Sequence, residues 1–479
     1  MEQSFASLSF YGGIALLVVY PLAQIFYNLF LHPLRDVPGP LLARATDLWL
    51  FANELEGHVH DKILKLHHKL GSFSEVYCQG TKFDKARYFY NAFVDQADNL
   101  FTMTDRDQHS HDKRLMSHAF SKTTILQQES VIYDFVQQLV GRMMPFAQSG
   151  KEFPLLAGYR CMTLDLITEF VFGATPKAIE SEDLNDPIID QIGDTATGSV
   201  VTQHIPFVRK VLRFLSKNKI TIPGFPDPVL NLGLAAKRGL EAMKTTSHVE
   251  WTMFKAMSAN ASKQGIQLRD EHLIAEGILM IIAGTDTTAV TLSTATYHLI
   301  KNPEIFERLR QEVAPFMPNK DARPSFNDLD HLPLLDACLK EGMRLSSPVR
   351  SRLPRVVPKD GWTSHGRFYK PGTIVSSSPL YLHQEPKIFH DCEAFNPDRW
   401  LVSPEKKSEM LHYFQPFSRG SRQCIGQNLS TIEQKITLAT IVARFAPVSV
   451  AKDTIEWGES STNALPDTQI YATMAARNM

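Results

Sequence analysis

One cysteine stands in a sequence pattern that could support metal binding or nucleophilic chemistry. Cys424 lies in the stretch Phe417–Gly426, which reads Phe-Ser-Arg-Gly-Ser-Arg-Gln-Cys-Ile-Gly. Gly420 and Gly426 allow a compact loop, and the apolar residues that follow recur at helical spacing. The sulfur is therefore expected near a helix N-terminus, where unpaired N–H groups favour the thiolate. Such a thiolate is a metal ligand or a nucleophile, whereas an isolated cysteine is more simply a small buried apolar residue.

A second polar cluster lies in the middle of a long apolar segment. Helical character extends from about Arg269 to Lys301, and Asn302-Pro303 ends it. Within this segment, an apolar run meets Ala283-Gly-Thr-Asp-Thr-Thr288. A glycine and several hydroxyl groups can open the helical hydrogen-bond ladder, so we expect a local kink beside a pocket. A helix that packs tightly on a neighbour through small and hydroxyl residues is the alternative.

A charged pair follows on another predicted helix. Glu341 and Arg344 are three residues apart, so their side chains can touch. Taken alone, such a pair would be exposed and would contribute only about 0.3–0.5 kcal/mol. Further along, the chain reads Phe395-Asn-Pro-Asp-Arg399-Trp400, which adds another arginine beside an aromatic side chain.

In combination these patterns resemble the cytochromes P450, the haem-thiolate monooxygenases. The spacing Phe-x-x-Gly-x-Arg-x-Cys-x-Gly is complete and resembles the haem-binding signature of that family. Residues 283–288 resemble its oxygen-activation motif, and residues 395–400 resemble its Pro-x-Arg-Phe/Trp motif. With Glu341-x-x-Arg344 between them, the four motifs occur in family order. The resemblance implies a mainly α fold with small β-sheets, the cytochrome P450 fold with an N-terminal transmembrane helix.

The resemblance assigns roles on the two sides of the cofactor. Cys424 would be the proximal iron ligand of haem b (iron protoporphyrin IX), and Phe417 and Gly426 belong to the same haem-binding signature. A thiolate in this position pushes electron density onto the iron and favours O–O cleavage. On the opposite side, Asp286 and Thr287 would deliver protons through water during dioxygen activation.

Four further residues match positions that bind the haem propionates in this family. Arg355 matches the second propionate donor and Arg422 the third. On the predicted helical segment 109–120, the family has a tryptophan and an arginine four residues apart, and the matching residues here are His109 and Lys113. Both can still donate charge-assisted hydrogen bonds to a carboxylate. A solvated helix face would also explain this basic segment.

By the same resemblance, Glu341, Arg344 and Arg399 form a buried triad with a structural role. The triad would fix the loop that leads to Cys424. If the triad is buried, removal of one member would leave an unpaired charge and cost roughly 3–5 kcal/mol.

The N-terminus has the character of a membrane anchor. From Gln3 to Leu34 the chain contains no Lys, Arg, Asp or Glu, and Phe10–Leu31 supplies about 22 mostly apolar residues, enough to cross a bilayer. A cleaved signal peptide is the alternative. We predict a membrane anchor over 1–32, a proline-rich hinge over 33–44 and a haem-thiolate catalytic domain over 45–479. Basic residues after the span favour a single-pass protein of the endoplasmic reticulum membrane with a cytosolic catalytic domain.

The composition excludes several other classes of protein. The chain has 479 residues, 21% charged residues and a formal net charge of −1, which describes an ordinary folded chain with no sign of nucleic-acid binding. Its five cysteines are odd in number and show no Cys-x-x-Cys spacing. Neither a disulfide framework nor a zinc site is therefore indicated.

Two regions depart from the family or resist interpretation. A helix is predicted over 53–70, and the segment from Gly71 to Gly80 is too short for the two-stranded hairpin that usually follows in the family. One strand pair is therefore expected to be short or missing. Residues 201–230 are apolar and proline-rich, and by resemblance they form the roof of the substrate channel.

The reaction that the resemblance implies is the insertion of one oxygen atom from O₂ into an apolar small molecule. NADPH-cytochrome P450 reductase would supply the electrons. Sequence segments such as Ser351-Arg-Leu-Pro-Arg355-Val-Val resemble those of fungal cytochromes P450 of secondary metabolism, including the trichodiene oxygenase group. This resemblance favours a terpenoid or polyketide-like substrate. The alternatives are a haem-thiolate isomerase or dehydratase that needs no O₂, and a non-catalytic haem-binding protein. The presence of Asp286 and Thr287 favours oxygen chemistry.

Overall fold

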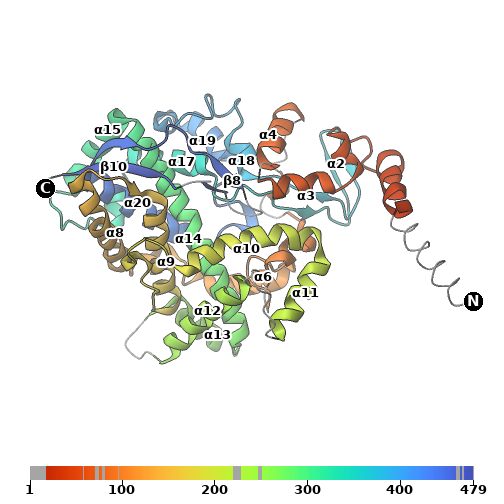
Figure 1. Ribbon diagram of the computed structural model, residues 1–479, viewed down its shortest axis with the longest axis horizontal. Coiled ribbons are helices and arrows are strands. Elements are labelled where there is room, and N and C mark those ends of the chain that lie inside the picture. The colour runs from red at the N-terminus through yellow and green to blue at the C-terminus, as the bar shows by residue number, and fades with distance from the viewer. Residues whose placement is uncertain are drawn as a thin grey trace, which may run out of the picture. The chain divides into compact units, whose positions relative to one another are not determined.

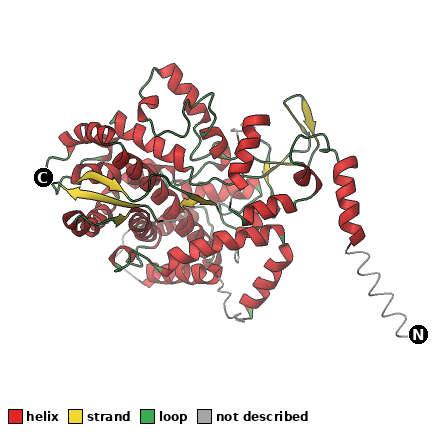
Figure 2. Ribbon diagram, turned by 45° about the horizontal axis from the view of Figure 1, so that its top comes forward, coloured by secondary structure: helices red, strands yellow, loops and turns green. Residues whose placement is uncertain are grey.

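The computed structural model describes residues 18–57, 59–70, 75–77, 81–94, 97–218, 228–245, 251–459, 464–466 and 469–477 of the chain. Most of these residues are helical, and the strands are few and short (Figures 1 and 2). The prediction of a mainly α fold with small β-sheets is therefore confirmed. The residues up to Gly71 and those from Ser72 onward form two separately packed units, so each is described by itself.

The described part of the first unit is entirely helices and turns. Residues 18–31 are helical and end in the π-helical turn η1, Tyr27–Leu31. Three short helices follow: α2 Leu41–Ala45, α3 Leu48–Leu55 and α4 Val59–Leu70. The single helix predicted over 53–70 is thus wrong. Gly57 has a φ of +74° between α3 and α4, a left-handed conformation that ends a helix and that glycine adopts at little cost.

Among the described residues, one helix is long and apolar enough to cross a membrane, and it is an internal one, α14, Asp270–Lys301. Within α14, 67% of the most apolar window is buried in the protein, which is the behaviour of a core helix. Residues Val18–Leu31 form a shorter apolar helix with exposed side chains such as Val19 and Phe30. The anchor over 1–32 stays a prediction, since residues 1–17 lie outside the described part.

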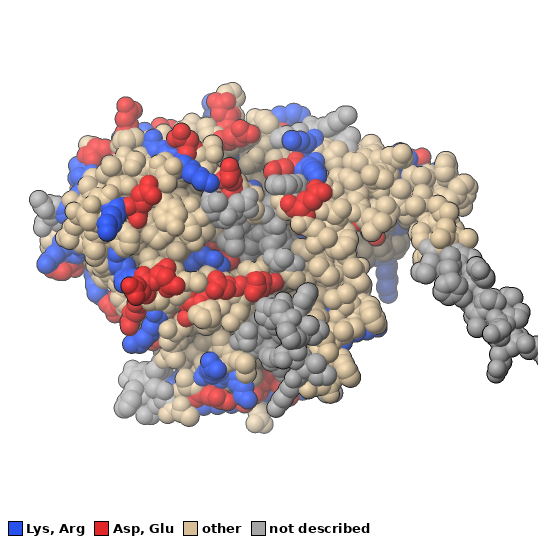
Figure 3. Space-filling model, viewed as in Figure 1, with Lys and Arg blue, Asp and Glu red and all other residues tan. Residues whose placement is uncertain are grey.

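The second unit is built mainly from long helices. They are α6 Arg106–Ser117, α8 Glu129–Ser149, α9 Leu155–Phe172, α10 Pro187–His204, α11 Pro206–Lys217, α12 Pro228–Thr245, α13 Met253–Lys263, α14, α15 Pro303–Val313, α17 Pro333–Ser346, α19 Pro404–Tyr413 and α20 Gln427–Arg444. The shorter helices are η2 Glu75–Tyr77, α5 Arg87–Tyr90, η3 Asn91–Phe93, α7 Lys122–Leu126, η4 Ala178–Glu180, η5 Ala314–Phe316, α16 Phe326–Asp330, α18 Pro379–His383, η6 Pro397–Trp400 and η7 Gly420–Arg422. Side chains of both signs occur on the face shown in Figure 3, in keeping with a net charge of −1.

The strands among the described residues form four small antiparallel sheets. In the first sheet, β3 lies between β1 and β6, and Lys85 of β1 stands directly opposite Arg355 of β3. In the second sheet, β10 lies between β2 and β7, and the strand pairs β4–β5 and β8–β9 form the other two sheets. The strands are β1 Asp84–Lys85, β2 Phe153–Pro154, β3 Arg355–Val356, β4 Trp362–Ser364, β5 Arg367–Tyr369, β6 Ile374–Val375, β7 Phe445–Val450, β8 Trp457–Glu459, β9 Ala464–Pro466 and β10 Tyr471–Ala476.

The long helix α14 packs against α9, α12, α17 and α20. It is continuous from Asp270 to Lys301, so the opening of the hydrogen-bond ladder expected at residues 283–288 does not occur, while the kink expected there stays a prediction. The hydroxyls of Thr285 and Thr287 donate to the carbonyls four residues earlier, Ile281 O at 2.7 Å and Ala283 O at 2.8 Å, and thereby supplement the ladder without opening it. Gly284 serves packing: a Cβ there would stand 2.5 Å from Cγ1 of Ile167 on α9.

The structure describes only part of the two regions that the sequence analysis left open. The predicted short segment after Gly71 lies mostly outside the described residues. Of residues 201–230, the structure describes the end of α10, all of α11 and the start of α12, while residues 219–227 lie outside it.

Replacing Gly284 with alanine should destabilise the protein by about 1–3 kcal/mol, because the added Cβ overpacks the contact between α9 and α14. Thermal unfolding of the purified protein measures the effect. Gly198→Ala in α10 is the matched control, since a Cβ there meets nothing within 4 Å and alanine is the better helix former. Equal melting temperatures for Gly284→Ala and the unmodified protein would contradict this interpretation of Gly284.

Candidate active site

Cys424 lies in a tight loop at the start of α20. Ser418 and Gly420 adopt positive φ values of 58° and 75°, which turn the chain sharply. The backbone N–H of Cys424 then donates to Phe417 O at 3.0 Å and closes the loop. Gly426 is the residue directly before α20. The structure therefore places the sulfur at a helix N-terminus, where the sequence pattern had predicted it.

The Cys424 side chain is accessible and is held by donors. Of the four cysteines within the described residues, Cys424 is the exposed one. Desolvation raises the pKa of its thiol, while the backbone N–H of Gly426, the charge of Lys113 and the backbone N–H of Gln427 act in the opposite direction. A bound metal ion deprotonates a coordinating thiol outright. The loop thus provides a metal ligand together with the donors that stabilise its thiolate form.

Two basic residues join the cysteine loop to α6 and the segment before it. Lys113 Nζ donates to Ser421 O at 3.0 Å and to Gln423 O at 2.8 Å, on either side of Arg422. Arg422 donates to Met103 O at 2.8 Å and also to the next two carbonyls along the chain. These bonds fix the loop, and Lys113 keeps one N–H for another acceptor.

The segment bound by Arg422 is itself tied to α14. Glu276 is fully buried and its Oε1 accepts from the backbone N–H of Leu100 at 2.8 Å. Asn99 Nδ2 donates to Ala275 O at 3.3 Å. Desolvation raises the pKa of Glu276 to about 8, so this carboxyl is largely protonated at neutral pH.

The residues predicted to bind propionates converge on one place. His109 is buried, and desolvation followed by the charges of Arg422, Lys85, Lys113 and Arg355 lowers its pKa to about 3. Burial among these cations therefore keeps the His109 imidazole neutral, and its ring N–H can still donate. Arg355 is also buried and donates to Pro354 O at 3.0 Å and to the hydroxyl of a neighbouring tyrosine.

The sequence analysis missed one member of this cationic group, Lys85. It is buried in β1, and no local motif marks it. Within the described part of the chain, no carboxylate forms an ion pair with Lys85, Lys113, Arg355 or Arg422. Converging basic side chains that form no ion pair with a described carboxylate, next to an accessible thiol, fit a flat prosthetic group that carries a metal ion and two carboxylates.

Asp286 and Thr287 are neighbours that point in different directions. Asp286 is buried, and its Oδ1 accepts from Arg160 Nε of α9 at 2.8 Å, while its Oδ2 has no partner among the described residues. Thr287 is partly exposed, and one turn earlier Ala283 is exposed in an otherwise mostly buried helix. The face of α14 with Thr287 is thus accessible to a ligand. The sequence analysis missed Arg160. The signal that could have found it is that Arg160 is the one basic residue in the apolar helix α9.

The helix that carries the polar motif is hydrogen-bonded to the helix that follows the cysteine. Thr288 Oγ1 and Ser430 Oγ are 3.0 Å apart, and Gln434 Nε2 donates to the same Ser430 oxygen at 2.7 Å. The accessible residues Thr287 and Cys424 therefore lie close to the point where α14 and α20 meet.

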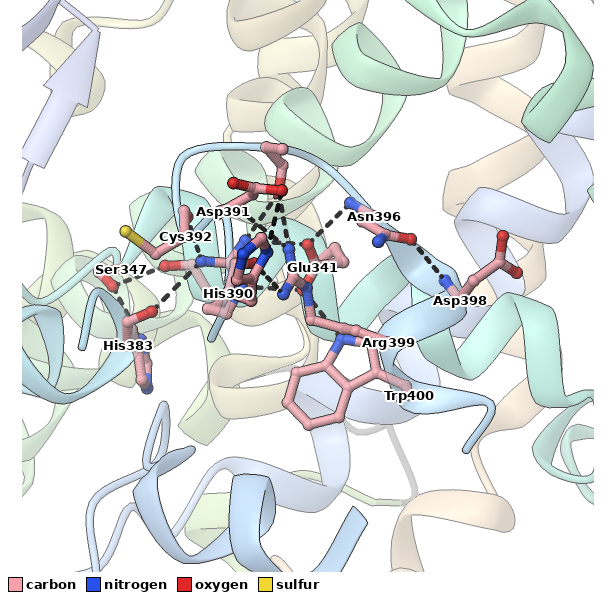
Figure 4. A network of polar contacts seen from close by, with 12 residues as sticks. Glu341, Ser347, His383, His390, Asp391, Cys392, Asn396, Asp398, Arg399 and Trp400 are labelled. Carbon is pink, nitrogen blue, oxygen red and sulfur yellow. Dashed lines mark hydrogen bonds and ion pairs between the residues drawn. The ribbon is translucent and has the colours of Figure 1, made fainter. Parts of the chain in front are cut away.

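Behind the cysteine loop, a buried network is centred on Glu341 (Figure 4). Arg344 donates to both carboxylate oxygens, at 2.8 and 2.9 Å. Trp400 Nε1 donates to Oε1 and the backbone N–H of Asn396 to Oε2, both at 2.9 Å. Arg399 Nε lies 3.2 Å from Oε1 as an ion pair, although its N–H is not aligned for a hydrogen bond. The structure thus brings Glu341, Arg344 and Arg399 together.

This network reaches the cysteine loop through His383. Arg344 donates to His383 O at 3.2 Å, and the two ring nitrogens of His383 bond to Ser347 Oγ at 2.8 Å and to the backbone N–H of Gln415 at 3.0 Å. Burial and the charge of Arg344 lower the pKa of His383 to about 3. Both nitrogens are occupied, so His383 has a structural position, and Gln415 lies two residues before Phe417.

The fold and this site define a haem-thiolate protein: an accessible cysteine at a helix N-terminus, cations for two carboxylates and a polar motif on the helix that meets it. A family model described as Cytochrome P450 matches residues 62–463. The chain belongs to the cytochrome P450 family.

Relatives of known name agree with this assignment. The chain is 31% identical over 382 residues to the cytochrome P450 monooxygenase penB of Penicillium thymicola, over 78% of this chain and 85% of the relative. It is 29% identical over 452 residues to poxM of Penicillium oxalicum, over 89% and 86%. It is 29% identical over 462 residues to TRI4 of Trichoderma arundinaceum, over 91% and 88%. All three are named cytochrome P450 monooxygenases, and the chain is accordingly a haem-thiolate monooxygenase.

Replacing Glu341 with glutamine should destabilise the protein by roughly 3–5 kcal/mol, because the buried Arg344 would lose its only carboxylate partner in the described residues. Glu241→Gln is the matched control, since Glu241 forms an exposed pair with Lys237 at 3.9 Å and exposed pairs contribute about 0–1 kcal/mol. Denaturant unfolding of the haem-loaded protein measures both variants. Similar losses in the two would mean that the Glu341 network is not a buried anchor.

Proposed function

We propose that this protein is a membrane-anchored monooxygenase that inserts one oxygen atom from O₂ into an apolar small molecule, with electrons from NADPH through cytochrome P450 reductase. The observation that carries the proposal is the accessible Cys424 sulfur at the start of α20, surrounded by donors and by basic side chains that form no ion pair with a described carboxylate. The prosthetic group is haem b, which supplies the activation of O₂ when it is bound.

On the cysteine side, the protein provides the ligand and its surroundings. Cys424 is the thiolate ligand, and the backbone N–H groups of Gly426 and Gln427 stabilise its charge. Arg355 and Arg422 bind the haem carboxylates, with His109 as a further hydrogen-bond donor. Lys113 holds the loop through two carbonyls and offers its remaining N–H. Phe417 contributes the carbonyl that closes the loop.

On the α14 side, the protein supplies protons. Thr287 presents its hydroxyl on the accessible face of the helix, where it can pass a proton to a ligand or to water. Asp286 has one carboxylate oxygen fixed by Arg160 and one without a described partner, which can exchange a proton with water. Arg160 is then a positioning residue, since it fixes the direction in which the free oxygen points.

The domain organisation and location complete the proposal. Residues 1–32 anchor the protein in the endoplasmic reticulum membrane as a single span, residues 33–44 form the hinge, and residues 45–479 form the cytosolic catalytic domain. The uncharged run from Gln3 to Leu34 and the exposed apolar side chains of residues 18–31 support this. The proposed substrate is a fungal secondary metabolite, terpenoid or polyketide-like, and the fungal origin of the relatives supports the fungal part of this proposal.

The direct test of the haem-thiolate site is the absorption spectrum of the reduced protein with carbon monoxide. Cysteine thiolate ligation should give a Soret band at about 450 nm, and Cys424→Ser should lose this band. A band at about 420 nm from correctly folded unmodified protein would refute Cys424 as the ligand. Consumption of NADPH and O₂ with the reductase then separates a monooxygenase from an isomerase or a non-catalytic haem protein.

Replacing Thr287 with alanine should leave the haem spectrum intact while product formed per NADPH falls by roughly tenfold or more, because a proton-donating hydroxyl is lost. Reducing equivalents would appear as peroxide or water. Thr294→Ala is the matched control: this residue lies two turns further along α14, is buried, and bonds to the carbonyl four residues earlier just as Thr287 does. Unchanged coupling in Thr287→Ala would argue against the role of its hydroxyl.

A further inference from the structure

Lys85 is a buried amine that faces the buried guanidinium of Arg355. It stands directly opposite Arg355 in the antiparallel pair of β1 and β3, so the two side chains project from the same face of the sheet. Both residues are buried, at 7% and 4% exposure, while their strand neighbours Asp84 and Val356 are more open. Like charges directly opposite each other destabilise a strand pair, and burial strengthens their repulsion.

Neutral groups offset only part of this repulsion. Lys85 Nζ lies 4.6 Å from the ring centroid of Tyr90 and 5.1 Å from that of Phe101, and it donates to Phe101 O. The Arg355 guanidinium lies over Tyr77 and over the same Tyr90 ring, at 5.1 and 5.6 Å. Aromatic faces attract cations, but they do not neutralise two of them. An ammonium has three donors, so Lys85 keeps two for another acceptor.

Further cations surround the same place. Desolvation lowers the pKa of Lys85 well below its usual range, and the charges of Arg355, Arg422 and Lys113 lower it further, so the ammonium form is disfavoured unless an anion binds there. Arg422 is two residues from Cys424, so this cationic group lies beside the proposed metal ligand. Only an anion bound among these side chains would turn their mutual repulsion into attraction, and a haem beside Cys424 brings two carboxylates.

We propose that Lys85 and Arg355 together bind one carboxylate of the haem, with Lys85 as a donor that the sequence motifs of the site do not include. This inference rests on the proposed function, because it takes the ligand of Cys424 to be a haem. It assigns Lys85 as a cofactor-binding residue supplied by the strand pair β1–β3.

The test compares haem retention and reduction potential in Lys85→Met, Lys85→Arg and Lys82→Met holoenzymes. Lys82 is the matched control, since it lies three residues earlier and forms an exposed pair with Asp360 at 3.1 Å. Haem transfer to excess apomyoglobin should be about tenfold faster from Lys85→Met, as expected for the loss of one hydrogen bond to a charged group. Its midpoint potential should become more negative, because a nearby positive charge stabilises the reduced haem. Lys85→Arg and Lys82→Met should resemble the unmodified protein.

The outcomes separate this inference from the proposed function. A haem release rate and potential in Lys85→Met equal to those of the unmodified protein, with the band at about 450 nm present, would overturn the role of Lys85 alone. Absence of that band in the unmodified protein would instead overturn the haem-thiolate site. Faster release without a change in potential, unrepaired by Lys85→Arg, would show that Lys85 acts only through Phe101 O. If Lys85→Met does not fold, Lys85→Gln carries the same comparison, because it keeps a donor without the charge.

Discussion

The arrangement of the site depends on one buried carboxylate, Glu341. Its two oxygens accept from Arg344, Trp400 and the backbone of Asn396, and Arg344 in turn donates to Cys392 O and Ala394 O. A buried charge is costly unless its hydrogen-bonding capacity is satisfied, and here each oxygen has at least two partners. Since the same arginine bonds to His383 O, and His383 bonds to the segment before the cysteine loop, the position of the sulfur follows from this carboxylate.

The motifs that were readable from the sequence are those whose geometry is local. The cysteine loop and the helix after it depend on residues within ten positions of one another, and the bounds of α14 follow from a run of apolar residues and a proline. Lys85 and Arg160 could not be found in this way. Their roles arise from the register of β1 with β3 and from the packing of α9 on α14, and neither the register nor the packing leaves a pattern in neighbouring residues.

Two wrong predictions about single helices both concern a glycine. Gly284 was interpreted as a point of weakness in the long helix, but the missing Cβ lets Ile167 approach, and the adjacent threonine hydroxyls bond back to the helix. Gly57 was included within a helix, although its positive φ ends α3. The sequence shows that a glycine is present, but whether it relieves a close contact or reverses the chain depends on what packs around it.

The pairing of β1 with β3 has a consequence for the order in which the molecule assembles. Tyr77, close to β1 in sequence, donates to Leu353 O, which lies 276 positions further along the chain. Closing so large a loop is entropically unfavourable, and the strands that it joins carry like charges. The pairing of β1 with β3 is therefore not expected early in folding. It follows the synthesis and collapse of the helices that lie between the two strands in the sequence.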